Sequence, residues 1–228
     1  MKIALFSDLH LNHWPEVDVD LAMEIVANRC KDADVICNAG DNGEATIIYN
    51  LAKYFPHQEY LEVKGNHDYY GGVFKNEFYT REIGPYRFFC ATLWTNFNDN
   101  PLAETIAARC INDFRYIEGA NIETMKKAFY ETRKALAEYR PQIVMTHFAP
   151  FHKSIDPKYG ETPLNYFFCN DMKNTLSRQT QIRLWMHGHT HTPMDYQIDG
   201  RKVAANQLGY RGENYRHFEH FYPQIIDI

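Results

Sequence analysis

The chain opens with KIALFSDLH at residues 2–10, an apolar run that ends in a carboxylate and an imidazole. The same layout recurs further along the chain, where four more apolar runs end in short polar blocks. The blocks are Gly40-Asp41, Gly65-Asn66-His67-Asp68, Thr146-His147 and Gly188-His189-Thr190-His191. An apolar run of this length bounded by turn residues is typical of a buried strand. Five strand ends that carry carboxylates, imidazoles and one amide together indicate a two-metal hydrolytic centre.

The elements around the first blocks alternate between strand and helix. Strands are predicted at 2–6, 35–38 and 60–63, and helices at 21–30 and 44–54, where apolar residues recur at helical spacing. Such alternation favours an α/β fold with a largely parallel sheet.

The second half of the chain has a different pattern. We predict strands at 87–95, 143–145 and 184–186, an amphipathic helix at 122–139, and a hairpin of 194–198 with 202–205 around Asp199-Gly200. Residues 96–121 and 148–175 are expected to be irregular. Without repeats or an obvious linker, we expect one domain over residues 1–228, with a mixed second sheet.

Composition narrows the class of protein. A net charge of -5 argues against a broad surface for duplex nucleic acid or anionic membranes. No apolar run approaches the ~20 residues that span a bilayer. The five cysteines contain no CxxC pair and mostly have apolar neighbours, which is typical of reduced thiols. A soluble cytoplasmic protein is therefore expected.

Each polar block also has an ordinary structural interpretation. Asp8 could cap a helix beside a surface histidine, and Asp41 could simply occupy a turn. Asp8 and His10 lie two apart in the sequence, so their side chains can point the same way. The two oxygens of the Asp41 carboxylate could each bind one cation, which suits a ligand shared by two metals. His147 alone would more often be structural.

The histidine-rich blocks are more specific. In the third block, Asp68 is placed to orient His67 as a proton donor, because a carboxylate partner fixes an imidazole's tautomer. His189 and His191 alternate, so they face one way on an extended segment. His187 shares that parity, and a supporting role or simple burial is equally open for it.

The ordered set of blocks resembles the calcineurin-like metallophosphoesterases, relatives of the purple acid phosphatases and the Mre11 nucleases. The resemblance covers Asp8 to His191. It implies a four-layer αββα sandwich, with two mixed β-sheets flanked by helices. The segments 91–95, 147–150 and 206–210 are similar to a bacterial and phage branch, in which the last usually reads Asn-Pro-Arg-Gly-Tyr. Gln207 and Leu208 depart from that pattern.

The resemblance also implies the role of each site residue. One metal would be held by Asp8, His10, Asp41 and His191, and the other by Asp41, Asn66, His147 and His189. His67 would be catalytic, with Asp68 orienting it, and Glu44 would be structural or support the ligands. Manganese is the first choice for the two divalent or trivalent ions, with Fe, Zn, Co or Ni as alternatives.

The predicted activity is hydrolysis of phosphate esters through attack by a metal-bound hydroxide. Small, nucleotide-like phosphodiesters are favoured over monoesters. An Mre11-like nuclease and an inactive binding scaffold are further alternatives. Substrate contacts are predicted at Asn12, His13, Trp94 and His152, which follow the ligand blocks or lie in neighbouring segments. The sequence leaves the oligomeric state open.

Overall fold

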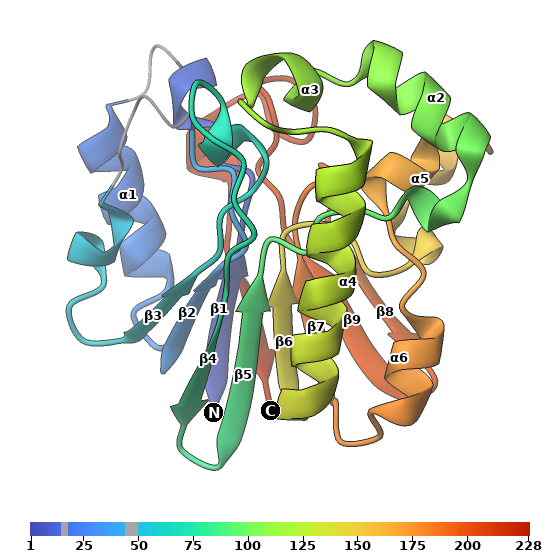
Figure 1. The fold of residues 1–228 in the computed structure, drawn as a ribbon. Helices are drawn as coiled ribbons and strands as arrows, with labels where there is room; N and C mark the ends of the chain where they lie inside the picture. The colour runs from blue at the N-terminus through green and yellow to red at the C-terminus, as the bar shows by residue number, and fades with distance from the viewer. Residues whose placement is uncertain (15–17, 44–49) are drawn as a thin grey trace.

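The fold consists of two β-sheets packed face to face and covered by helices (Figure 1). The computed structural model describes residues 1–14, 18–43 and 50–228. The small sheet has the strand order β10-β1-β2-β3, and the large sheet has the order β4-β5-β6-β7-β9-β8. Both sheets are mixed, which confirms the predicted αββα sandwich.

The small sheet is parallel except at one edge. Strands β1 (Lys2–Phe6), β2 (Val35–Asn38) and β3 (Glu59–Glu62) run parallel, and β10 (Gln224–Asp227) pairs antiparallel with β1. The described chain between β1 and β2 contains helix α1 (Val19–Arg29), which forms a βαβ unit with them.

The large sheet has a parallel centre with antiparallel edges. Strands β5 (Tyr86–Ala91), β6 (Ile143–Thr146), β7 (Leu184–His187) and β9 (Arg201–Ala205) are parallel. The edge strands β4 (Phe78–Ile83) and β8 (Met194–Ile198) pair antiparallel with β5 and β9. The β8–β9 pair is the predicted hairpin.

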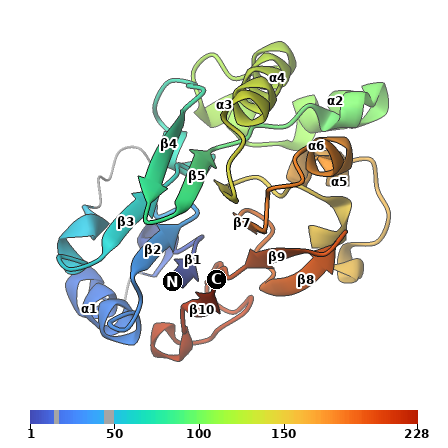
Figure 2. The same ribbon diagram turned by 90° about the horizontal axis from the view of Figure 1, so that it is seen from below.

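The core follows from the alternation of side chains along each strand. In β1, Ile3 and Leu5 point between the sheets, whereas Ala4 and Phe6 pack toward α1. Seen from below, α1 covers the outer face of the small sheet and α4 (Ile122–Tyr139) the outer face of the large one (Figure 2). Both faces of the central strands are therefore buried, as their continuous apolar runs require.

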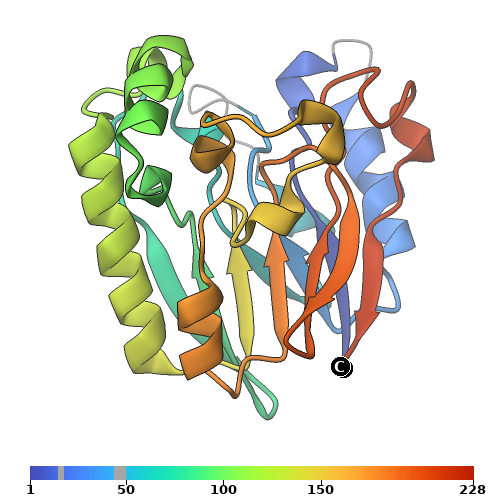
Figure 3. The same ribbon diagram turned by 90° about the vertical axis from the view of Figure 1, so that its right-hand side faces the viewer.

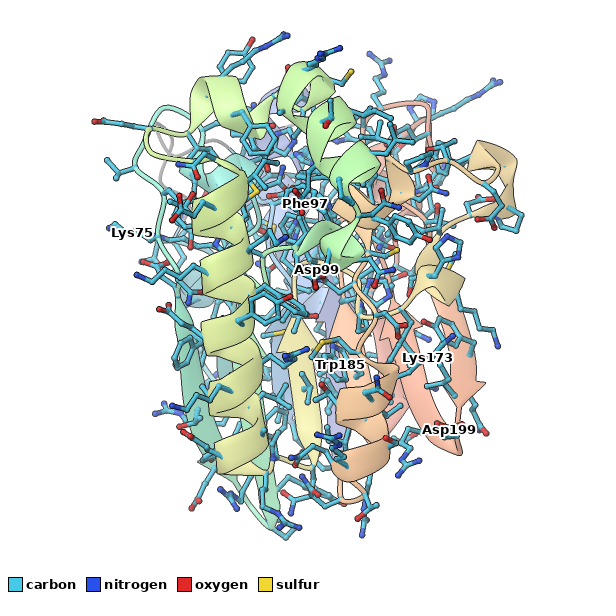
Figure 4. All side chains as sticks on the ribbon, turned by 45° about the vertical axis from the view of Figure 1, so that its right-hand side comes forward. Lys75, Phe97, Asp99, Lys173, Trp185 and Asp199 are labelled. Atoms are coloured by element: carbon cyan, nitrogen blue, oxygen red, sulfur yellow. The ribbon has the colours of Figure 1, made fainter. Side chains whose placement is uncertain are left out.

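The outer helices begin at capping side chains. Asp18 accepts a hydrogen bond from the Leu21 amide at the start of α1, and Asn121 forms a capping box with Thr124 at the start of α4. Trp185 of β7 lies between α4 and α6 (Lys173–Arg178), where it fills the layer against the large sheet (Figure 4).

Four regions differ from the sequence predictions, and a fifth lies mostly outside the described residues. Residues 96–121 contain α2 (Pro101–Cys110) and α3 (Asp113–Tyr116), and residues 148–175 contain α5 (Asn165–Phe168) and the start of α6. Strands β4 and β10 were not predicted. The predicted helix at 44–54, with Glu44, lies outside the described residues except for its end, a 3-10 turn at Leu51–Tyr54. Further 3-10 turns occur at Leu11–His13, His67–Tyr69, Phe97–Asp99, His152–Ser154, Pro157–Tyr159 and Phe218–His220.

The parallel strands of both sheets end at the same side of the molecule. The segments that follow β6, including α5, lie over these strand ends (Figure 3). All five polar blocks follow such strands, so their side chains meet there.

Within the described ranges, no helix is both long and apolar enough to cross a bilayer. The five cysteines are free thiols, four of them buried.

Candidate metal centre

Five site residues adopt a left-handed backbone directly after their strands. The residues with positive φ are Asp8 (52°), His10 (42°), Asp41 (58°), His189 (71°) and His191 (47°). Non-glycine residues rarely adopt this conformation, which costs free energy that the surrounding structure must supply. The strained turns aim the side chains of both sheets toward one another, and they fall on the residues predicted as ligands.

Asp8, His10 and His191 form the first cluster, which we call the outer group. His191 Nε2 is 3.4 Å from Asp8 Oδ1 and 2.9 Å from His10 Nε2. Donors that share one ion, with bonds of about 2.0–2.2 Å, stand roughly 3–3.5 Å apart. His191 Nδ1 donates to Glu213 Oε2 at 2.7 Å, which leaves Nε2 free to face the cluster.

Asp41, His147 and His189 form the second cluster, which we call the inner group. His147 Nε2 is 3.3 Å from Asp41 Oδ2, and its Nδ1 donates to the Ala39 carbonyl at 2.7 Å. The same Asp41 oxygen is 3.8 Å from His10 Nε2. Asp41 therefore lies between the two groups.

Asn66 joins the inner group through its amide oxygen. Asn66 Oδ1 is 3.2 Å from His147 Nε2, and its Nδ2 donates to Asp113 Oδ1 at 2.9 Å. Tyr70 donates its hydroxyl proton to the same Asp113 oxygen at 2.8 Å. Asp113 thus fixes which end of the Asn66 amide faces the histidines. No sequence pattern pointed to Asp113, because it lies in the segment that was predicted to be irregular.

Two glycines let the strand-end loops come close enough. A Cβ atom at Gly65 would stand 2.1 Å from Asp41 Oδ1, and one at Gly188 would stand 2.7 Å from Asp8 Oδ2. Neither contact is sterically allowed. The glycine that opens the third block and the glycine that opens the fifth are therefore needed for packing against a carboxylate.

The electrostatics of the two groups fit cations. Burial lowers the pKa of His147, but the Asp41 carboxylate outweighs burial and raises this pKa to about 9. Burial likewise lowers the pKa of His191, yet Asp8 and Glu213 raise it to about 10. The carboxylates thus favour positive charge at these two histidines, whereas burial lowers the pKa of His10 and of His189 and keeps them neutral donors. The oxygen and nitrogen donors of the set suit divalent transition metals.

His67 lies beside both groups without joining either. Its ring is 4.8 Å from that of His10 and stacks on Tyr70 at 4.2 Å, and its Nε2 is 3.3 Å from the Tyr210 hydroxyl. Burial lowers the pKa of His67. The imidazole is therefore within reach of a ligand bound between the groups.

Asp68 differs from its predicted role of orienting the His67 ring. Its carboxylate instead accepts hydrogen bonds from the main-chain amides of Asp41, Asn42, Gly43 and Gly65. Because both oxygens are occupied in this way, Asp68 ties the loop of the second block to that of the third. The partner of His67 is Tyr210, from the tail segment that the sequence singled out without a role.

A cavity of about 510 Å³ opens beside the site. Side chains of both groups and His67 line one side, and some of the residues in segments 110–113, 155–168 and 210–213 line the rest. Tyr70 also lines the cavity and lies two residues after the third block, so its position was a usable signal. The others are far from any block in sequence.

The predicted substrate contacts do not line this cavity. Trp94 is fully buried and donates to the Lys75 carbonyl at 2.8 Å, so the prediction that it lines a cleft is wrong. His152 pairs with Glu161 at 3.4 Å. His13 lies at the rim, 5.0 Å from the Tyr210 ring, and Asn12 precedes it in the same turn.

His187, whose role the sequence left open, is a buried supporting residue. Its Nε2 is 2.8 Å from Ser154 Oγ, and its Nδ1 donates to the Gly188 carbonyl at 2.9 Å. Burial lowers the pKa of His187 to about 4. It therefore fixes the loop before His189 as a neutral side chain.

A family model described as calcineurin-like phosphoesterase matches residues 1–193. The chain belongs to the calcineurin-like phosphoesterase family. This phosphoesterase is therefore a hydrolase that acts on phosphate ester bonds, and its two groups of metal-ligand side chains agree with the binuclear centre of the family. It is 25% identical to the uncharacterized protein L509 of Acanthamoeba polyphaga mimivirus, over 91% of this chain and 90% of that one.

Solved structures of phosphoesterases share this fold. The phosphopantetheinyl hydrolase PptH from Mycobacterium tuberculosis aligns with a TM-score of 0.72 and 14% identity, over 98% of this chain and 95% of its own. A dimetal phosphatase from Danio rerio aligns with a TM-score of 0.56 and 12% identity, over 98% of this chain and 90% of its own. At such identities the likeness shows the architecture alone.

Proposed function

We propose that this phosphoesterase hydrolyses small, nucleotide-like phosphodiesters and uses two divalent cations, with manganese as the first to test. The proposal depends on one observation. The outer and inner groups meet at the mouth of a cavity whose described lining contains carboxylates and no lysine or arginine. A cytoplasmic location stays a prediction.

The ligand assignment follows the positions of the donor atoms. One cation would be held by Asp8, His10, Asp41 and His191, and the other by Asp41, Asn66, His147 and His189. When bound, the pair supplies neutralisation of phosphate charge and a water of lowered pKa.

The protein's own contribution to the reaction is centred on His67. Hydrolysis breaks the bond between phosphorus and the leaving oxygen, which must then take up a proton. His67 Nε2 is the group free to deliver that proton, since the neighbouring histidines belong to the two groups. Its ring is held between Tyr70 and the Tyr210 hydroxyl, so its direction is fixed before the substrate binds.

The charge of the cavity favours diesters. A phosphate monoester carries about -1.5 to -2 at pH 7, whereas a diester has only a single ionised oxygen. Asp156 and Glu213 line the cavity, where Glu213 pairs with His191, and the described lining contains no lysine or arginine. The second negative charge of a monoester would therefore depend on the cations alone.

The test compares matched nitrophenyl esters on the manganese-loaded protein. We expect two manganese ions per chain and a kcat/KM for bis(4-nitrophenyl) phosphate that exceeds that for 4-nitrophenyl phosphate. The reverse order would identify a phosphomonoesterase. Cleavage of long single-stranded DNA would favour the nuclease, and a protein that binds no metal and releases no nitrophenol would be the inactive scaffold.

A further inference from the structure

The cavity is much larger than a phosphate group needs. Its volume of about 510 Å³ falls in the range of roughly 300–1,000 Å³ typical of sites for small organic ligands. The metal-ligand side chains occupy only one side of it. The rest of the cavity is therefore available to the organic group that is attached to the phosphate.

Five side chains of the lining are apolar or aromatic and cluster on the segments beside the two groups. We call this cluster the apolar wall and define it as Tyr70, Ile111, Leu164, Phe167 and Phe168. It begins within ring contact of the site, since Tyr70 stacks on His67 at 4.2 Å and Phe168 lies 5.3 Å from the His189 ring. A group joined to phosphate through one oxygen would therefore reach the apolar wall directly.

The charged residues around the cavity are all acidic or already paired. Glu213 Oε2 accepts from His191 and from the Tyr210 amide, and Asp113 Oδ1 accepts from Asn66 and Tyr70. Asp156 pairs with Lys158 at 3.2 Å, and Lys158 is not part of the lining. A second anionic group in the cavity would lose water and gain no cationic partner, which is costly.

We propose that the apolar wall binds the organic group of the ester, and that this group is uncharged and presents aromatic or apolar surface. The inference rests on the proposed phosphodiesterase function and narrows its substrate class. It selects esters with a single phosphate and a flat or apolar substituent. It excludes nucleoside polyphosphates and esters whose substituent carries a carboxylate.

Phosphonates test this inference because each carries one organic group and is not hydrolysed. The ligands are methylphosphonate, phenylphosphonate, propylphosphonate and 2-carboxyethylphosphonate, of which the last two are matched in size. Affinity for the manganese-loaded protein is measured by calorimetry and by inhibition of bis(4-nitrophenyl) phosphate hydrolysis. We expect phenylphosphonate to bind roughly 10- to 100-fold more tightly than methylphosphonate, as burial of a ring predicts. We expect 2-carboxyethylphosphonate to bind more weakly than propylphosphonate. Equal affinities for all four, or a preference for the carboxylate, would overturn the inference.

A matched pair of lysine substitutions locates the effect. Ile111→Lys places a cation in the apolar wall, and Leu102→Lys places one on an exposed position of the neighbouring helix α2, where Leu102 is 56% exposed. We expect Ile111→Lys to reduce the preference for phenylphosphonate about 10-fold or more and to improve binding of 2-carboxyethylphosphonate. Leu102→Lys should match the unmodified protein. Identical profiles for the two variants would contradict the assignment.

Two further measurements keep the outcomes separate. If thermal melting shows that Ile111→Lys is unfolded, Leu164→Lys makes the same test from the opposite segment. If no nitrophenyl ester is hydrolysed, the proposed function fails, while calorimetry still shows whether the apolar wall selects uncharged groups. Hydrolysis together with indifference to the phosphonate substituent would refute the inference and leave the proposed function in place.

Discussion

The outer and inner groups use the same chemistry, but the protein holds them in different ways. In the inner group, the side chains of His147 and Asp41 are 0% and 1% exposed, and His147 Nδ1 is bound to a main-chain carbonyl. In the outer group, the His191 side chain is 14% exposed, and its Nδ1 is bound to Glu213, whose side chain is 39% exposed. One group is fixed by the backbone at the end of a sheet, and the other by a side chain of the tail loop.

This difference predicts that the two cations bind with different affinity. The Ala39 carbonyl keeps its position as long as β2 does, because Ala39 follows the strand directly. Glu213 holds His191 only while the 210–213 segment stays in place. We therefore expect the outer cation to bind more weakly and exchange faster than the inner one, because the residues that hydrogen-bond to ligand histidines tune metal affinity.

The largest effect is expected from Asp41→Asn, which removes the charge shared by the groups. Its Oδ2 lies 3.3 Å from His147 Nε2 and 3.8 Å from His10 Nε2. We predict that both cations are lost and that diester hydrolysis falls roughly 10⁴-fold or more, because metal charge stabilisation is worth several kcal/mol. Mass spectrometry of bound metal and kcat on the diester check this, with exposed Asp227→Asn as the control. Full retention of one cation would assign Asp41 to a single group.

The next largest effect is expected at His67, which separates metal binding from proton delivery. His67→Gln should keep both cations and lose about 10²–10⁴-fold in kcat on esters with poor leaving groups. Nitrophenyl esters should lose less, because their leaving oxygen needs no proton. The exposed His57→Ala serves as the matched control. Equal turnover of alkyl esters by His67→Gln and the unmodified protein would reject the role.

Much of the sandwich and of the site was predictable because the signals are local. An apolar run followed by a turn residue marks a strand and its end, and parallel strands end at one edge. The two clusters contain six of the seven residues predicted as ligands, and the seventh, Asn66, contacts His147. Their division into two metal sites came from the resemblance to the calcineurin-like family, which depends on the order of the blocks.

The parts that were not predictable depend on contacts far apart in sequence. Helix α2 buries only the small residues Ala103 and Ala107, so its apolar periodicity is weak despite its Asn100 cap. Strand β4 has five exposed residues and no alternation. Trp94 was misplaced because nearness to a block in sequence does not say which way a side chain points. The apolar wall combines segments that only the fold brings together.

A smaller effect is expected from the residues that hydrogen-bond to the ligands, and it tests the comparison of the outer and inner groups directly. Glu213→Gln weakens the acceptor of His191 Nδ1, whereas Asp113→Ala releases the Asn66 amide. We predict that each variant weakens one of two metal-binding steps by about 10- to 100-fold and leaves the other unchanged. Calorimetric manganese titration resolves the steps. If both substitutions moved the same step, the division into outer and inner groups would be wrong.

The smallest effect concerns Glu62, which supports the loop of the second block. Its carboxylate accepts from Asn42 Nδ2 at 2.7 Å and from the Tyr60 hydroxyl at 2.9 Å, behind the loop that carries Asp41. Burial raises the pKa of Glu62 above its usual value of 4.5. The folded state therefore keeps this proton to higher pH than the unfolded state does, and stability is lost as pH rises from 4.5 through the raised pKa.

Glu62→Gln removes that titration while keeping an amide oxygen as acceptor for Asn42. Urea midpoints of the metal-free protein are measured at several pH values upward from 4.5. The midpoint of the variant should rise relative to that of the unmodified protein across this window. Glu219→Gln, an exposed glutamate in the tail segment, should follow the unmodified curve instead. Parallel curves for Glu62→Gln and the unmodified protein would mean that this carboxyl group ionises without cost. The loop that carries Asp41 would then be insensitive to the charge of Glu62 behind it.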